Sequence, residues 1–422
     1  GMAAASGALS AFASFGLAAS GSGDRIRIAC IGVHGRGRAH VRAFSSAKDS
    51  IVAAICDVDL NVCAQAVKMA EQNQGSSPKV VQDIRRILDD KGIDAVSIAT
   101  PDHWHALAAV WACQAGKDVF LEKPISHNIS EGRRVIEAVQ KYKRILQTGT
   151  GSRSREWIRQ AIDFLHTGGL GQIYMAKGLC YKRRQSIGRK PDGPAPDGVD
   201  YDLWLGPAPK RAFNPNRFHY NWHWFWDYGV TDMGNQGVHQ MDIARWGLGK
   251  QELPKRIHCI GSKYLYDDDQ ETPNTQLATF EYDDGTALVF EVRGLITNEE
   301  KNVRIGNIFY GEKGYLTIGD GGWQAYLGEK GEPGPGARPG KEPDPHFQNF
   351  LDAVKSRNPG ILTAGVRDGH LSAALCHLGN ISYRTGRKLA FDPVTETFPG
   401  DSEASAHLRR QYRKPFVLPD KI

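Results

Sequence analysis

Two glycines and an aspartate near the start of the chain have the types and spacing to bind a dinucleotide. Gly32 and Gly37 follow an apolar run and fit the first and third positions of a G-x-G-x-x-G turn, whereas His34 occupies the second position. Such a turn lets the backbone approach a pyrophosphate at a helix amino end. Asp57 ends the next apolar run, where a carboxylate would accept the adenosine ribose hydroxyls and repel a 2′-phosphate. The pattern predicts NAD as the cofactor, with NADP less favoured.

The elements that must position these residues are buried parallel strands that alternate with helices. The apolar runs starting at Ile26, Ile51, Ala95 and Val119 alternate with helical patterns. The last of these runs leads into Glu122, Lys123 and Pro124 and brings them to the carboxyl edge of the sheet, where open α/β sheets bind ligands. We therefore predict an α/β fold with an N-terminal Rossmann domain, a doubly wound parallel sheet, over residues 23–150.

Composition sets the broad class of protein. The chain has 422 residues, a formal net charge of +6 and seven scattered cysteines. This length favours two domains, and the small, dispersed charge argues against a nucleic-acid partner. The composition is not that of a membrane-embedded protein, and the cysteines are expected to be buried free thiols. Apolar and polar residues alternate between 255 and 326, which predicts an antiparallel sheet in a second, substrate-binding α/β domain over residues 151–422.

The order of five motifs resembles the glucose-fructose oxidoreductase and inositol dehydrogenase family, also called Gfo/Idh/MocA. The motifs are IGVHGRGRAH, CDVD, ATPDHWHA, AGKDVFLEKP and GNQGVHQMDIARW. The resemblance implies redox chemistry at a sugar or polyol hydroxyl, no metal, and an open, mainly antiparallel C-terminal sheet that often forms a homo-oligomer interface. It implies that Lys123 is the catalytic lysine, with a cis peptide bond to Pro124. The predicted cofactor-binding residues are Gly32, His34, Gly35, Arg36, Gly37, Asp57, Thr100, Pro101, His103, Trp104, His105, Glu122 and Lys123, with His103 to His105 on the nicotinamide side.

The predicted catalytic face of the second domain lies in GNQGVHQMDIARW. Asn235, His239 and Asp242 share one stripe if this segment is a continuous helix. The family pattern has Asp where this chain has Asn235, and an amide cannot take a proton. We therefore expect His239 to accept the hydroxyl proton, Asp242 to orient it, and Lys123 to place a cation near the oxygen. Asp232, one turn earlier, is a further carboxylate that could assist.

An aromatic run from 213 to 229 is the second feature of the predicted substrate site. Pyranose rings stack on indoles, so Trp222, Trp224 and Trp226 fit sugar binding, but an alternating aromatic run also fits a strand that buries one face in a core. Both interpretations stay open for each tryptophan. The predicted substrate-binding residues are Arg153, Tyr181, Arg217, His219, Trp222, Trp224, Asp232 and His239.

These features predict an NAD-dependent oxidoreductase that transfers a hydride between a ring hydroxyl of a sugar or glycoside and nicotinamide. Two alternatives remain, an NAD-dependent glycoside hydrolase that acts by transient oxidation and elimination, and a noncatalytic sugar-binding protein. Residues 1–22 are almost entirely Ala, Gly, Ser, Leu and Phe, which resembles a remnant of a twin-arginine export signal. We expect a periplasmic protein, with a cytoplasmic one as the alternative.

Overall fold

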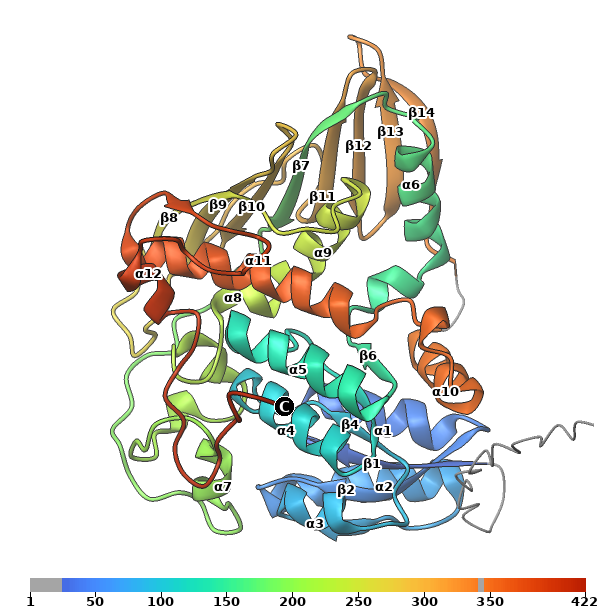
Figure 1. Ribbon diagram of the computed structural model, residues 1–422, viewed down its shortest axis with the longest axis vertical. Helices are drawn as coiled ribbons and strands as arrows, with labels where there is room; N and C mark the ends of the chain where they lie inside the picture. The colour runs from blue at the N-terminus through green and yellow to red at the C-terminus, as the bar shows by residue number, and fades with distance from the viewer. Residues whose placement is uncertain (1–24, 341–344) are drawn as a thin grey trace, which may run out of the picture.

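The computed structural model describes residues 25–340 and 345–422 (Figure 1). The predicted export segment, residues 1–22, lies outside the described residues. Within the described part of the chain, no helix combines the length and the apolar character needed to cross a membrane. All seven cysteines are buried and free, as predicted.

The first sheet has six strands in the order β3-β2-β1-β4-β5-β6, and all neighbouring strands are parallel. The order reverses between β1 and β4, which creates a crevice at the carboxyl ends of the strands. The predicted Rossmann sheet is therefore confirmed. The strands are β1 (Ile26–Ile31), β2 (Ser50–Cys56), β3 (Lys79–Val81), β4 (Ala95–Ile98), β5 (Asp118–Leu121) and β6 (Leu146–Thr148).

Helices cover both faces of this sheet. One face packs against α1 and α2, and the other against α3, α4 and α5, so the strands are buried on both sides. The helices are α1 (Arg36–Ser46), α2 (Cys63–Gln74), α3 (Ile84–Asp89), α4 (Asp102–Gln114) and α5 (Ile129–Tyr142).

The glycine turn after β1 packs too closely for side chains. A Cβ atom on Gly37 would lie 1.7 Å from the carbonyl oxygen of Gly32. Gly32 has φ +78°, and a Cβ there would lie 2.7 Å from the carbonyl oxygen of Ala99. These two glycines therefore let α1 begin directly above the ends of β1 and β4.

The second sheet has nine strands in the order β14-β13-β12-β11-β7-β10-β9-β8-β15. β7 and β10 pair in parallel, and the other neighbours are antiparallel, which confirms the predicted open, mainly antiparallel sheet. The strands are β7 (Ile173–Cys180), β8 (Arg256–Ser262), β9 (Thr275–Glu281), β10 (Ala287–Arg293), β11 (Ile305–Gly311), β12 (Gly314–Gly319), β13 (Gly322–Leu327), β14 (Glu332–Ala337) and β15 (Leu389–Ala390).

The helix α11 lies between the two sheets (Figure 1) and contacts α5 and β6 on one side and α9 and β8 on the other. Its Ala373 belongs to the core of the first sheet, and its Leu375 belongs to the core of the second. The remaining α-helices are α6 (Glu156–His166), α7 (Tyr201–Leu205), α8 (Thr231–Asn235), α9 (Gly237–Gly247), α10 (His346–Ser356), α11 (Val366–Thr385) and α12 (Ser402–Ala406). The described residues also contain five 3-10 helices: η1 (Leu60–Val62), η2 (Gly151–Ser154), η3 (Pro215–Arg217), η4 (His219–Trp224) and η5 (Pro359–Ile361).

The C-terminal part of the chain also completes the first core. Phe350 and Leu351 of α10 are fully buried in one cluster with Phe44 of α1 and Phe120 of β5. The α10 helix is thus distant in sequence from the Rossmann domain but packs into it. The α11 helix, which packs on both sides, fixes the second sheet relative to the first.

We predict that Gly37→Ala lowers the free energy of unfolding by about 1–3 kcal/mol, because the new methyl group must displace the Gly32 backbone. The loss is measured as a lower apparent melting temperature, together with weaker dinucleotide binding. Gly193→Ala is the matched control, since nothing lies within 4 Å of a Cβ atom at Gly193. Equal stability of the two variants would contradict the close packing of the turn.

Candidate active site

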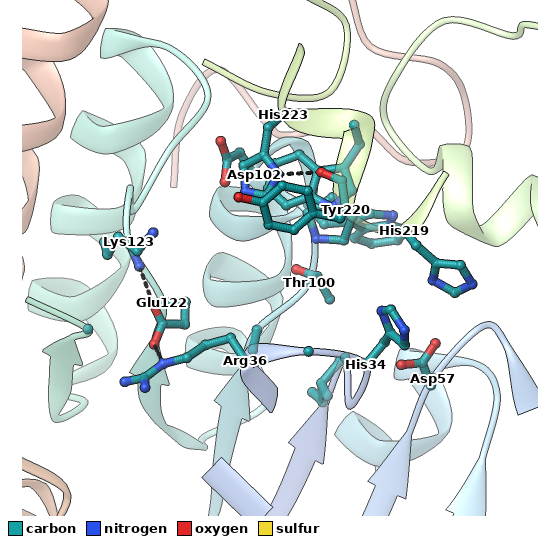
Figure 2. A pocket seen from close by; sticks show the side chains of 18 of the residues that line it. His34, Arg36, Asp57, Thr100, Asp102, Glu122, Lys123, His219, Tyr220 and His223 are labelled. Carbon is teal, nitrogen blue, oxygen red and sulfur yellow. Dashed lines mark hydrogen bonds and ion pairs between the residues drawn. The ribbon is translucent and has the colours of Figure 1, made fainter. Parts of the chain in front are cut away.

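A pocket of about 490 Å³ lies at the carboxyl edge of the first sheet. The turns after β1, β2, β4, β5 and β6 form one wall, and α7, the 3-10 helix η4 and the α8–α9 junction form the other. Figure 2 shows Lys123 and Glu122 on one side of this pocket and His34 and Asp57 on the other. The pocket therefore joins the predicted dinucleotide turn to the predicted catalytic lysine.

At the Asp57 end, backbone groups hold the carboxylate. Its Oδ2 accepts a hydrogen bond from the Val33 N–H at 2.7 Å, and its Oδ1 accepts one from the Asp59 N–H at 3.0 Å. Burial raises the pKa of Asp57, and these backbone hydrogen bonds oppose the increase. The side chain lines the pocket beside the glycine turn, where the ribose prediction requires it.

The structure places His219 at this same end rather than beside Lys123. Its ring lies 4.2 Å from the ring of His34, centroid to centroid, and its Nε2 lies 3.2 Å from Asp59 Oδ2. His219 thus closes the pocket between the glycine turn and the strand end of β2. This position differs from the sugar-contacting role that we expected.

Glu122 organises the turn at the opposite end. Its Oε1 accepts hydrogen bonds from Arg36 Nε at 2.7 Å and from His40 Nε2 at 2.9 Å. Burial acts to raise the pKa of Glu122, but the His40 hydrogen bond and the Arg36 charge outweigh it and hold the pKa well below its usual range. Glu122 is therefore a fixed carboxylate that ties the glycine turn to the end of β5.

Lys123 connects this edge to the second domain. Its Nζ donates a hydrogen bond to the backbone carbonyl oxygen of Asn235 at 2.8 Å. The Lys123–Pro124 peptide bond is cis, as the family resemblance implies. Asn235 also lines the pocket, and its Nδ2 lies 3.2 Å from Asp232 Oδ1.

His239 lines the pocket near Lys123, as predicted for the proton acceptor. Burial lowers its pKa to about 3, and the charge of Lys123 acts in the same direction. The ring is therefore neutral near pH 7 and has a lone pair available. The segment is not one helix, however, because α8 ends at Asn235 and α9 begins at Gly237. The expected continuous stripe is interrupted at Gln236.

Asp242 and Arg153 are buried together and do not line the pocket. Arg153 Nε lies 2.8 Å from Asp242 Oδ2, its Nη2 lies 3.0 Å from Oδ1, and Ser372 Oγ donates to Oδ1 at 2.6 Å. Both carboxylate oxygens of Asp242 thus accept hydrogen bonds, as a buried charge requires to be stable. Asp242 therefore does not orient His239 through a hydrogen bond, and Arg153 does not reach a substrate in this pocket.

Asp232 is also held by an arginine. Arg184 Nε and Nη2 bond its two oxygens at 2.7 and 2.6 Å, and Arg184 Nη1 donates to the Tyr220 hydroxyl at 2.8 Å. Tyr220 lines the pocket, whereas Asp232 is buried behind it. The expected free carboxylate is thus part of a bridge that holds Tyr220. Arg184 could not be identified from its sequence position, because its partner Asp232 is 48 residues away.

Two other predicted substrate residues lie outside the pocket lining. The Tyr181 hydroxyl donates to Glu291 at 2.8 Å within the second sheet. Arg217 Nη1 bonds the Ala212 carbonyl at 3.0 Å and lies 3.2 Å from Asp192. Neither side chain is available at the Lys123 end of the pocket.

The aromatic run contains the 3-10 helices η3 and η4 rather than a strand, and its tryptophans have different roles. Trp222 lines the pocket, and its ring stacks on His223 at a centroid distance of 3.6 Å. Trp224 is buried in an aromatic core cluster, and Trp226 stacks on Tyr383. Of the three tryptophans, the pocket receives only Trp222.

Of the three residues predicted on the nicotinamide side, Trp104 lines the pocket and the two histidines support its wall. His105 Nδ1 lies 2.6 Å from the Pro124 carbonyl oxygen, and its Nε2 lies 2.8 Å from that of Thr100. His103 Nε2 lies 2.9 Å from the Trp204 carbonyl oxygen. Among the described residues, no cluster of His, Cys, Asp and Glu is arranged to hold a metal ion.

Asp102 is a pocket residue that no sequence pattern singles out. It is 2 % exposed, and its Oδ2 has no hydrogen-bond partner among the described residues. Burial raises the pKa of Asp102 well above its usual value, against the opposing charge of Lys123. An Asp in the first turn of a helix is common on the surface, so its sequence position carried no signal of burial.

Two family models match most of the chain. Residues 26–150 match the oxidoreductase family's NAD-binding Rossmann fold, and residues 181–418 match the same family's C-terminal alpha/beta domain. The chain belongs to the Gfo/Idh/MocA oxidoreductase family. Its Rossmann domain is therefore a NAD-binding domain, and the close turn at Gly32 and Gly37 fits a dinucleotide at this place.

The similarity to relatives with assigned activities covers different shares of this chain. Inositol 2-dehydrogenase of Rhodococcus erythropolis is 25 % identical over 402 residues, which is 90 % of this chain and 98 % of the relative. A glycosyl hydrolase family 109 protein of Shewanella sp. is 32 % identical over 122 residues, which is 28 % of this chain and 27 % of the relative.

Solved structures show the same fold. The WlbA dehydrogenase of Chromobacterium violaceum, in complex with NADH and UDP-GlcNAcA, has a TM-score of 0.66 and 19 % identity, over 88 % of this chain and 97 % of that one. A levoglucosan dehydrogenase in complex with NADH and levoglucosan has a TM-score of 0.66 and 16 % identity, over 87 % of this chain and 99 % of that one. At these sequence identities, the structural similarity shows a shared fold alone.

We predict that Arg153→Ala destabilises the protein by about 3–5 kcal/mol, because it leaves the Asp242 carboxylate buried without its partner. Thermal unfolding measures the loss. Arg159→Ala changes an exposed arginine on α6 and is expected to stay within about 0.5 kcal/mol of the wild type. If Arg153→Ala unfolds like the wild type but binds substrate more weakly, Arg153 is a ligand rather than a structural partner.

Proposed function

We propose that the protein is an NAD-dependent oxidoreductase that transfers a hydride between a ring hydroxyl of a sugar or glycoside and the nicotinamide. One observation carries this proposal: a lysine ammonium and a neutral histidine line the same pocket as the glycine turn and Asp57. The full-length similarity to an inositol 2-dehydrogenase supports a cyclic polyol or sugar as the substrate class.

The cofactor-holding groups lie along one wall of the pocket. The backbone at Gly32 and Gly35 would hold the pyrophosphate and Asp57 would hold the ribose, and Thr100, Pro101 and Trp104 line the same pocket. We assign NAD rather than NADP because the Asp57 carboxylate would repel a 2′-phosphate. Bound NAD supplies the hydride acceptor.

The protein's own side chains move the proton and stabilise the oxygen. His239 is neutral and accepts the hydroxyl proton of the substrate. Lys123 donates a hydrogen bond to the same oxygen and stabilises the negative charge that develops as the proton leaves. The Asn235 carbonyl holds the ammonium in place, and the Asn235 amide can bond a neighbouring hydroxyl. Trp222 offers an indole face for the apolar side of the ring.

The direct experiment is to purify the protein, identify the nucleotide that it binds, and test glycosides for both NADH absorbance and released aglycone. We expect NAD and net NADH formation. Aglycone release without net NADH would instead indicate the redox-assisted glycoside hydrolase, and ligand binding without hydride exchange would indicate a noncatalytic protein. The partial similarity to a glycosyl hydrolase family 109 protein makes the aglycone assay necessary.

Export and self-association are further parts of the proposal. The Ala/Gly/Ser-rich segment 1–22 supports export, to be tested by cell fractionation against a cytoplasmic location. Exposed apolar side chains on the second sheet support a homo-oligomer through this sheet, to be tested by light scattering; they are Tyr174 on β7, Ile260 on β8 and Leu277 on β9.

We predict that the acid limb of kcat/KM lies well below pH 6.5. Burial lowers the pKa of His239 to about 3, so the neutral, proton-accepting form persists as the pH falls from 7 to 5. A histidine with the ordinary pKa of about 6.5 would lose more than tenfold over that range. A pH profile of NADH formation measures this difference.

The same assignment predicts that His239→Gln lowers kcat by about 100- to 10,000-fold. His258→Gln, an exposed histidine on β8, is the matched control and is expected to keep the wild-type rate. Normal turnover by His239→Gln would show that another group accepts the proton. An acid limb near pH 6.5 that persists in this variant would show the same.

A further inference from the structure

The Lys123 end of the pocket carries positive charge without a matching carboxylate. Lys123 Nζ bonds a backbone carbonyl, and none of the described carboxylates forms an ion pair with it. Arg155 lines the same pocket and is an exposed residue. Across residues 25–340 and 345–422, its guanidinium has no hydrogen-bond or ion-pair partner.

Arg155 belongs to the wall nearest the reacting groups. It follows the 3-10 helix η2, which contacts α9, the helix that carries His239. At the start of the same segment, Gly149 packs on Glu122, and a Cβ atom there would lie 2.9 Å from the Glu122 carboxyl group. Segment 149–155 thus borders the Lys123 end and lies away from Asp57.

The carboxylates around this end are already paired. Three of them each bond a guanidinium: Glu122 with Arg36, Asp232 with Arg184, and Asp242 with Arg153. Asp102 is the remaining carboxyl group, and burial, which disfavours its charged form, raises its pKa well above the usual value. Asn235 contributes an uncharged amide to the pocket lining. A neutral sugar would leave the charges of Lys123 and Arg155 unmatched, whereas an anionic substrate would complement them.

We propose that the sugar substrate carries an anionic group, a carboxylate or a phosphate, and that Arg155 binds this group. The proposal rests on the oxidoreductase function and adds its substrate class. A guanidinium presents two parallel N–H donors to either anion, and these charge-assisted hydrogen bonds are strong. Ser152, one turn before Arg155, lines the pocket and adds a hydroxyl donor. Lys123 stays with the hydroxyl that is oxidised.

The test compares matched sugars on the NAD-loaded enzyme: glucose, glucuronate and glucose 6-phosphate, and the corresponding galactose set. We expect at least one anionic member to have a kcat/KM about 10- to 100-fold above its neutral counterpart. Preference for the uronate would identify a carboxylate, and preference for the 6-phosphate would identify a phosphate. The KM of the anionic sugar should rise with salt concentration, because the contact is partly exposed.

Arg155→Gln should remove this preference by raising the KM for the anionic sugar at least tenfold, and Arg155→Lys should retain part of it. Arg159→Gln is the matched control, since Arg159 is an exposed arginine one turn further on and does not line the pocket. It should behave like the wild type. A neutral sugar preferred in every set, or an anionic preference that survives Arg155→Gln, would overturn the proposal.

A binding measurement separates this proposal from the oxidoreductase function. Sugars are titrated against the NADH-loaded enzyme, and the nicotinamide fluorescence reports occupancy without turnover. Arg155-dependent binding of an anionic sugar that is never oxidised would support the anion site and count against the dehydrogenase. Oxidation of neutral sugars without any binding of anionic ones would support the dehydrogenase and overturn the anion site. Failure of every sugar to bind would overturn it as well.

Discussion

The hydrogen bond from Lys123 Nζ to the carbonyl oxygen of Asn235, at 2.8 Å, is the contact on which the arrangement of the pocket depends. It joins the end of β5 to the end of α8, so the cation of one domain is fixed relative to His239 of the other. The contact needs the two sheets to be rigidly placed, which α11 provides by packing into both cores. A proton acceptor and a cation must lie near the same oxygen for hydroxyl oxidation. Here, that requirement is met by packing between domains rather than by one local motif.

Charge pairing decides which side chains remain available for chemistry. The acidic groups behind the pocket walls are held by arginines, as in the Asp232–Arg184 and Asp242–Arg153 pairs. Removing one member of such a buried pair is costly, so these residues stabilise the walls. Glu122 and Asp102 also line the pocket near the reacting centre, but Glu122 is paired with Arg36. The other groups there are basic or uncharged: Lys123, His239, Asn235 and Arg155. The same pairing thus supports both the assignment of His239 as proton acceptor and the anionic substrate.

The first domain could be predicted closely from the sequence, because its signals are local. A buried parallel strand needs a continuous apolar run, and a dinucleotide turn needs glycine where a Cβ would collide, as at Gly37. Asp57 and Lys123 follow from their places at strand ends. Each of these two residues could therefore be predicted from its neighbours in the chain alone.

The second domain was less predictable, because its site residues depend on partners far along the chain. Helical spacing placed Asp242 near His239 correctly, but the spacing does not show that Arg153, 89 residues away, occupies its carboxylate. In the same way, Trp222 and Trp224 are two residues apart, yet one faces the pocket and the other a core. Asp102 has the Val230 backbone as a hydrogen-bond partner, 128 residues further along the chain, which the sequence of α4 does not reveal.

The central claim is that a ring hydrogen of the substrate passes directly to the nicotinamide in this pocket. The most direct measurement uses a sugar deuterated at its ring carbons, incubated with the NAD-loaded enzyme, followed by mass spectrometry of the released nucleotide. The account predicts one deuterium on the nicotinamide ring, with no exchange from solvent water. A nucleotide that gains no deuterium from a sugar that the enzyme binds would contradict it.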